Sequence, residues 1–211
     1  MRRLLVAALL GAFVWHAPVR GALMEGVDYE SIPPHPVPPG GKIQVIEFFY
    51  YGCSSCSHFE PMLAGWLARK PEDVEFMRVP ALRRVAWIPL TRLYFALEET
   101  GALPRLHSEV YRAVHEEQRN LTTREEAVRW AASKGLDRAQ FEHTLRSDAV
   151  AIKTQKARDT TVEYGIRSTP SLVVDGRYLT TGGMLGSVER LVPVLDQLLD
   201  KVRRERAAPH E

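Results

Sequence analysis

The spacing of apolar positions changes twice along the chain, from strand-like to helical and back to strand-like. Residues 42–51 (KIQVIEFFYY) form a nearly continuous β-branched and aromatic run between glycines, which is typical of a central strand buried on both faces. A helix is expected to begin at Cys53 and to run through about Leu67. Residues 74–80 then alternate as a second strand would, so the first part of the chain predicts strand, helix, strand.

From about residue 81 to residue 164 the apolar spacing is helical. Thr122-Thr123-Arg124-Glu125 has the form of a capping box that opens one helix, and Asp137 is expected to cap the next. Three further helices are predicted over residues 89–100, 105–118 and 150–164.

Strand character returns at residues 170–174 and 177–181, which flank Asp175-Gly176, a strong two-residue hairpin signal. A final amphipathic helix is expected from residue 187 to about 204, and Pro193 should kink it or delay its start. The order is βαβ, a helical block, then ββα. It predicts an α/β fold in which residues 22–80 and 165–211 form one domain and residues 81–164 are an all-helical insertion.

The first 21 residues read as a secretory signal. Arg2 and Arg3 precede a twelve-residue apolar run that is too short to span a bilayer comfortably, and Val19 and Gly21 suit a cleavage site near residue 21. The alternative is a membrane anchor. After this segment, residues 22–41 are expected to form an extended, proline-rich arm.

Charge and composition narrow the class of protein. The whole chain carries a formal net charge of +2, but residues 1–21 hold three arginines and no acid, so the remainder has 28 − 3 = 25 basic and 26 acidic residues. A charge so close to zero gives no argument for nucleic-acid binding. Hydrophobic residues make up 45% of the chain, which is enough for a core without disulfide staples.

The two cysteines, Cys53 and Cys56, are the main candidates for chemistry. A disulfide closing so short a loop would stabilise the fold by only about 2 kcal/mol, against about 4.7 kcal/mol for a hundred-residue loop. At a helix N-terminus, however, unpaired N–H groups and the helix dipole favour the nucleophilic thiolate. Reactivity therefore explains the pair better: Cys53 would exchange disulfides and Cys56 would resolve the mixed disulfide.

In combination, these features resemble the DsbA family of periplasmic thiol–disulfide oxidoreductases, which have a thioredoxin-like fold with a helical insertion. The resemblance covers most of residues 25–204. It is carried by GKIQVIEFFYYGCSSCSHFEP, with Glu47 six residues before Cys53, by YGIRSTPSLVVDGRYL around Thr169-Pro170, and by LTRLYFALEETG.

The resemblance implies a mechanism and partners. A Cys53–Cys56 disulfide would pass to reduced, newly exported proteins, and a membrane quinone-linked partner of the DsbB type would reoxidise the enzyme. It implies a cis-proline at Pro170, which would present the backbone of Thr169 to a substrate strand. It also implies a monomer that needs no cofactor, metal or nucleic acid.

Glu47 lies within an apolar strand, where an unpaired carboxylate would be costly and burial should raise its pKa. Proton exchange with Cys56 is the functional interpretation, and a strand-edge glutamate reaching solvent is the alternative. Trp87, Met184 and Leu185 could border a peptide groove or simply pack in the core.

One feature departs from the family. Its most familiar motif is Cys-Pro-His-Cys, whereas Ser54 and Ser55 stand here between the cysteines. Neutral hydroxyls stabilise a thiolate less than a charged donor does, so a milder oxidant is predicted. Two other functions remain open. The protein could be a reductase or isomerase that is kept reduced, or a carrier that binds a soft metal with both thiols.

Overall fold

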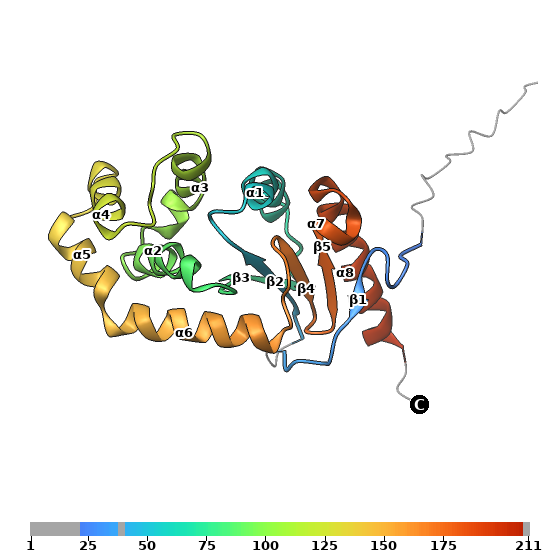
Figure 1. The fold of residues 1–211 in the computed structure, drawn as a ribbon. Helices are drawn as coiled ribbons and strands as arrows, with labels where there is room; N and C mark the ends of the chain where they lie inside the picture. The colour runs from blue at the N-terminus through green and yellow to red at the C-terminus, as the bar shows by residue number, and fades with distance from the viewer. Residues whose placement is uncertain (1–21, 38–40, 209–211) are drawn as a thin grey trace, which may run out of the picture.

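The computed structural model describes residues 22–37 and 41–208; the expected signal, residues 1–21, lies outside them. A five-stranded mixed sheet in the order β1-β5-β4-β2-β3 is at its centre (Figure 1). Only β2 and β3 run parallel, and the other neighbours are antiparallel. The strands are β1 (Glu30–Ser31), β2 (Ile43–Phe49), β3 (Val74–Pro80), β4 (Ser171–Val174) and β5 (Tyr178–Thr181).

The strand β2 is buried along its whole length, as its apolar sequence predicts. Its alternating side chains supply two cores. Val45 packs against α1 (Ser54–Leu67) and α8 (Leu191–Ala207) on one face. Ile46 and Phe48 pack on the other face, where Tyr164 follows the end of α6 (Asp148–Glu163). The sheet is therefore covered on both sides, which buries its central strand.

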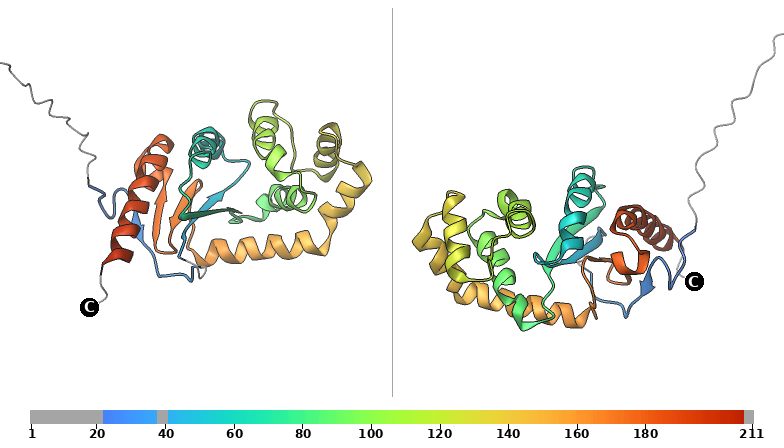
Figure 2. Two further views of the ribbon diagram at one scale, coloured as in Figure 1. Left: turned by 180° about the vertical axis from the view of Figure 1, so that it is seen from behind. Right: turned by 45° about the horizontal axis from the view of Figure 1, so that its top comes forward.

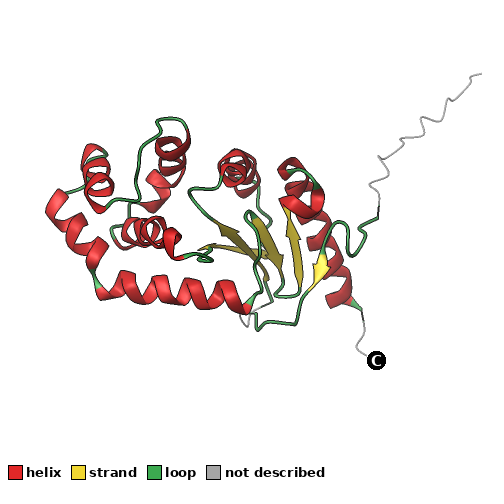
Figure 3. Ribbon diagram, viewed as in Figure 1, coloured by secondary structure: helices red, strands yellow, loops and turns green. Residues whose placement is uncertain are grey.

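A helical block lies beyond one edge of the sheet, between β3 and β4 in the chain (Figure 3). The long helix α6 leads back from this block to the sheet, and the view from behind shows it running below the other helices of the block and ending at the sheet (Figure 2). The block begins with a short 3-10 turn, η1 (Val85–Trp87). Its helices are α2 (Ile88–Glu99), α3 (Leu103–His115), α4 (Arg124–Ser133), α5 (Arg138–Arg146) and α6.

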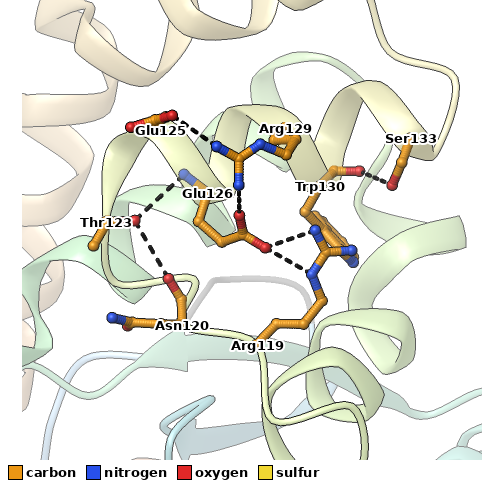
Figure 4. Close-up of polar contacts among 8 residues, drawn as sticks. All are labelled: Arg119, Asn120, Thr123, Glu125, Glu126, Arg129, Trp130 and Ser133. Carbon is orange, nitrogen blue, oxygen red and sulfur yellow. Dashed lines mark hydrogen bonds and ion pairs between the residues drawn. The ribbon is translucent and has the colours of Figure 1, made fainter.

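The expected capping box was placed one residue too early. Thr123, not Thr122, is the N-cap of α4, and its side chain accepts a hydrogen bond from the backbone N–H of Glu126 at 3.3 Å. The Glu126 carboxylate does not return to the cap but pairs with Arg119 and Arg129 (Figure 4). These arginines draw it away from the backbone, so only half of the motif forms.

The cap can be tested by comparing two adjacent threonines. Thr123→Ala should lower the free energy of unfolding by about 1 kcal/mol because one N–H at the start of α4 loses its acceptor. Thr122→Ala is the matched control and should cost less, since Thr122 contacts only Asn120 in this turn. Urea denaturation measures both, and equal losses would contradict the assignment of the cap.

Two further details differ from the sequence expectations. Residues 22–41 are not extended throughout, because residues 26–28 form a turn and β1 pairs with β5. A short helix, α7 (Gly182–Leu185), follows β5 and was not predicted. One expectation is confirmed, because Pro193 lies in the first turn of α8, after a second 3-10 turn, η2 (Val188–Arg190), and the start of the helix is delayed without a break in its interior.

Candidate active site

The two cysteines lie at the start of α1, at the carboxyl end of β2. Cys53 is the N-cap, with extended backbone angles, and Ser54 is the first helical residue. Cys53 is half-buried and Cys56 is fully buried, and both carry free thiols. A helix of 14 residues begins directly after a buried strand, so its unpaired N–H groups and positive dipole end meet the Cys53 sulfur.

These surroundings separate the acidities of the two thiols. The pKa of Cys53 is lowered to about 5, chiefly by a hydrogen bond from the Cys56 thiol, with further help from the Thr169 side chain and from backbone N–H groups of the helix. Burial raises the pKa of Cys56. Cys53 is thus a thiolate at neutral pH while Cys56 keeps its proton, which suits an outer nucleophile and an inner thiol that reacts second.

The loop before β4 faces the cysteine pair. The Thr169–Pro170 peptide bond is cis, and the Thr169 carbonyl oxygen lies 3.3 Å from Cys53 Sγ. A groove of about 410 Å³ adjoins this contact. It is lined by Ser54, Ser55, His58, Thr169, Pro170, Gly182, Gly183, Gly186, Ser187, Val188 and Glu189. A substrate chain in this groove can therefore lie beside Thr169 and close to Cys53.

The apolar residues considered for the groove do not line it. Leu185, the last residue of α7, is buried in the core that α8 helps to form. Trp87 stacks on Tyr50, with ring centroids 4.1 Å apart. Met184 is half-buried and also lies outside the lining. Hydroxyl groups, glycine backbone and the His58–Glu189 pair, 3.4 Å apart, make the groove polar.

Glu47 is buried, and its carboxylate has a charged partner. Arg78 stands directly opposite on β3 and donates to Glu47 Oε2 at 2.8 Å. Burial nevertheless outweighs this partner and raises the pKa of Glu47 to about 7. The solvent-reaching alternative fails, because only 1% of the residue is exposed. Glu47 shares its sheet face with Val45 and therefore lies under α1.

A buried polar chain continues from this pair into the helical block. Arg78 also donates to Glu60 on α1 at 3.0 Å. His107 Nε2 on α3 lies 3.3 Å from Glu60 Oε2, while its Nδ1 is 2.8 Å from the Tyr51 hydroxyl. Sequence reasoning missed these residues. Glu60 had a signal, since it is one helical turn beyond Cys56, but Arg78 and His107 come from segments whose register the sequence does not specify.

A helix-capping Cys-x-x-Cys pair facing a proline loop on a thioredoxin-like sheet, with a helical insertion, defines a thiol:disulfide oxidoreductase. Residues 76–191 match the model of the DSBA-like thioredoxin domain. The chain is 34% identical to the thiol:disulfide interchange protein DsbA of Pseudomonas aeruginosa, over 99% of each chain. Its identity to the DsbA of Bordetella pertussis is 37%, over 96% of this chain and 97% of the relative.

Solved structures agree. The crystal structure of Pseudomonas aeruginosa DsbA superposes with a TM-score of 0.81 and 34% identity, covering 87% of this chain and 96% of that one. The oxidoreductase NmDsbA3 of Neisseria meningitidis gives a TM-score of 0.74 at 31% identity, covering 88% of this chain and 100% of that one. The chain belongs to the DsbA family: it is a thiol:disulfide oxidoreductase that acts on protein substrates.

Proposed function

We propose that this protein introduces disulfides into exported proteins through a Cys53–Cys56 disulfide. A substrate thiolate attacks Cys53 Sγ, the Cys53–Cys56 bond breaks, and a mixed disulfide forms. A second substrate thiolate then displaces Cys53, so the substrate loses two electrons and two protons and the protein gains them as two thiols. The observation that supports this direction is the low pKa of Cys53, because a stabilised thiolate makes Cys53 a good leaving group and favours the reduced protein.

Three further residues have proposed roles. Thr169 and Pro170 hold the substrate main chain beside the reacting sulfur, which suits a sequence-tolerant enzyme. Glu47 exchanges a proton with Cys56, since a carboxyl group with a pKa of about 7 can accept and return protons at neutral pH. We assign residues 22–80 and 165–211 to the domain that carries the site, and residues 81–164 to the helical insertion.

The cellular setting is part of the same proposal. The signal expected at residues 1–21 would export the chain to the periplasm, where a disulfide persists. The protein would act as a monomer there, and a quinone-linked membrane partner of the DsbB type would take up its electrons. Among the described residues no helix is long and apolar enough to cross a bilayer.

The direction of transfer is tested with a reduced, unfolded protein that needs disulfides for activity. The oxidised protein, added in stoichiometric amount without another oxidant, should restore that activity while its own two thiols become free. Substrate recovery without a matching gain of two thiols per chain would contradict the oxidase. A protein recovered from cells mainly as the dithiol would favour the reductase or isomerase.

The serine pair tunes the strength of the oxidant. Because Ser54 and Ser55 are neutral and exposed, we propose a more reducing potential than that of family members with histidine in the motif. Ser55→His should lower the pKa of Cys53 and make the potential less negative by about 30 mV for each tenfold change in the exchange equilibrium. A glutathione titration measures this, with Ser55→Asn as the neutral control. A potential that is the same in both variants would contradict the proposal.

A further inference from the structure

Four arginines lie near the active site, and none of them lines the polar groove. Two belong to the loop between β3 and η1, one to the C-terminal half of α6, and one to the loop before β4. All four are exposed. We call them the arginine surface: Arg83, Arg84, Arg158 and Arg167.

Contacts between the segments hold these residues together. Arg83, Arg84 and Arg158 line one small cavity of about 70 Å³. A guanidinium nitrogen of Arg83 donates to the carbonyl oxygen of Arg167. The loop is fixed on α6 by the backbone N–H of Leu82, which donates to Thr161 Oγ1 at 3.1 Å. These contacts bring together the segments that carry the four arginines, although they are up to 84 residues apart in the chain.

None of the four pairs with an acid in residues 22–37 and 41–208. The arginines that form ion pairs there are Arg69, Arg78, Arg112, Arg119, Arg124, Arg129, Arg177, Arg190, Arg203 and Arg206. A cluster of uncompensated guanidinium groups repels itself, and binding a negatively charged ligand relieves that repulsion. Val85, the first residue of η1, is 75% exposed and lines the same small cavity, so it adds an apolar contact.

The arginine surface adjoins the reacting sulfur. Arg167 is two residues before Thr169, a span of at most about 7 Å between Cα atoms, and the Thr169 carbonyl is 3.3 Å from Cys53 Sγ. The polar groove, which none of the four arginines lines, carries the Glu189 carboxylate. A chain bound at Cys53 thus lies near both the positive arginine surface and the negative charge of Glu189.

We propose that the arginine surface is a docking site for acidic polypeptide segments, so that cysteines flanked by Asp or Glu exchange fastest with Cys53. This inference rests on the proposed function, since it names the substrates and partners that the same site prefers. Its position next to the exchange centre favours a polypeptide over an anionic membrane, because a segment bound there carries its own cysteine to Cys53. Arginine also suits carboxylates, which it can bind with two parallel hydrogen bonds.

Two dithiol peptides of equal length, one with four Glu and one with four Lys around the cysteines, test the inference. The oxidised protein should oxidise the acidic peptide at least about tenfold faster at low ionic strength. The preference should vanish near 1 M salt, where charges are screened beyond about 3 Å. Arg84→Glu/Arg158→Glu should reverse it. Comparing the acidic-to-basic rate ratio between wild type and variant cancels the intrinsic reactivity of each peptide.

Arg138→Glu is the matched control, an exposed arginine at the start of α5 in the far part of the helical block, and it should keep the wild-type ratio. Oxidation of dithiothreitol distinguishes a failure of the proposed function from a failure of the docking site alone. If the protein oxidises no dithiol at all, the proposed function fails. If it oxidises both peptides and the double variant leaves their ratio unchanged, only the docking site is overturned. Binding of phosphatidylglycerol vesicles that the double variant abolishes, together with an unchanged ratio, would assign the surface to lipid instead.

Discussion

Replacing Cys53 by serine is expected to abolish disulfide transfer, whereas replacing Cys56 by serine is expected to trap covalent complexes with substrates. Cys53 is the half-buried sulfur, with its pKa lowered to about 5, next to the Thr169 carbonyl. Cys56 is fully buried with a raised pKa. Only Cys53 is positioned for attack from outside, so a chain that retains it alone can form a mixed disulfide but cannot resolve it internally.

The measurement combines the refolding assay with non-reducing electrophoresis after an acid quench. Cys53→Ser should lower the rate of transfer to the uncatalysed background. Cys56→Ser, reacted with substrates that carry an activated disulfide, should give bands that a reductant removes. The double variant Cys53→Ser/Cys56→Ser is the control and should give none. Full transfer activity in Cys53→Ser would show that another group does the chemistry.

The second large effect is a pH dependence of stability that Glu47→Gln removes. The pKa of Glu47 rises from 4.5 to about 7 in the folded chain because burial opposes its charge. Between these values the unfolded chain has lost the proton and the folded chain keeps it, so the free energy of unfolding falls as pH rises. About 2.5 pKa units correspond to about 3 kcal/mol, which is fully lost above pH 7.

The test is the difference in unfolding free energy between wild type and Glu47→Gln, both reduced, from pH 4 to pH 8. Relative to Glu47→Gln, the wild type should lose about 3 kcal/mol of unfolding free energy as pH rises. The titration of Cys53 occurs in both proteins, so it cancels in the difference. Glu75→Gln, on the exposed side of β3, is the control and should give no such trend. A flat difference would mean that Arg78 keeps Glu47 ionised throughout.

The same variant probes the proposed proton exchange. In Glu47→Gln the resolving attack of Cys56 should slow, and its rate should lose the inflection near pH 7. Attack of the Cys53 thiolate on a small-molecule disulfide should keep its pH profile, because the acidity of Cys53 depends on Cys56, Thr169 and the helix N-terminus. A variant that slows both steps equally would indicate a structural role only.

Local features were predictable where neighbouring residues alone decide them. The buried run of β2, the start of α1 and the Asp175-Gly176 turn follow from nearby side chains. Both turn residues have the positive φ that this hairpin type requires. The N-cap of α4 was misassigned by one residue because two adjacent threonines offer the same signal, and ion pairs from Arg119 and Arg129 take up the side chain of Glu126.

The sequence by itself determined the fold class and placed a closely spaced cysteine pair at a helix start, because both depend on short stretches of chain with strong local preferences. The cis-proline at Pro170 was expected only from the resemblance to the DsbA family. Only the tertiary structure decided how distant charges meet. The parallel register of β2 and β3 sets Arg78 opposite Glu47, and the packing of a loop on α6 gathers the arginine surface. Register and packing depend on the burial of side chains that are far apart in the sequence, so no local sequence pattern predicts them.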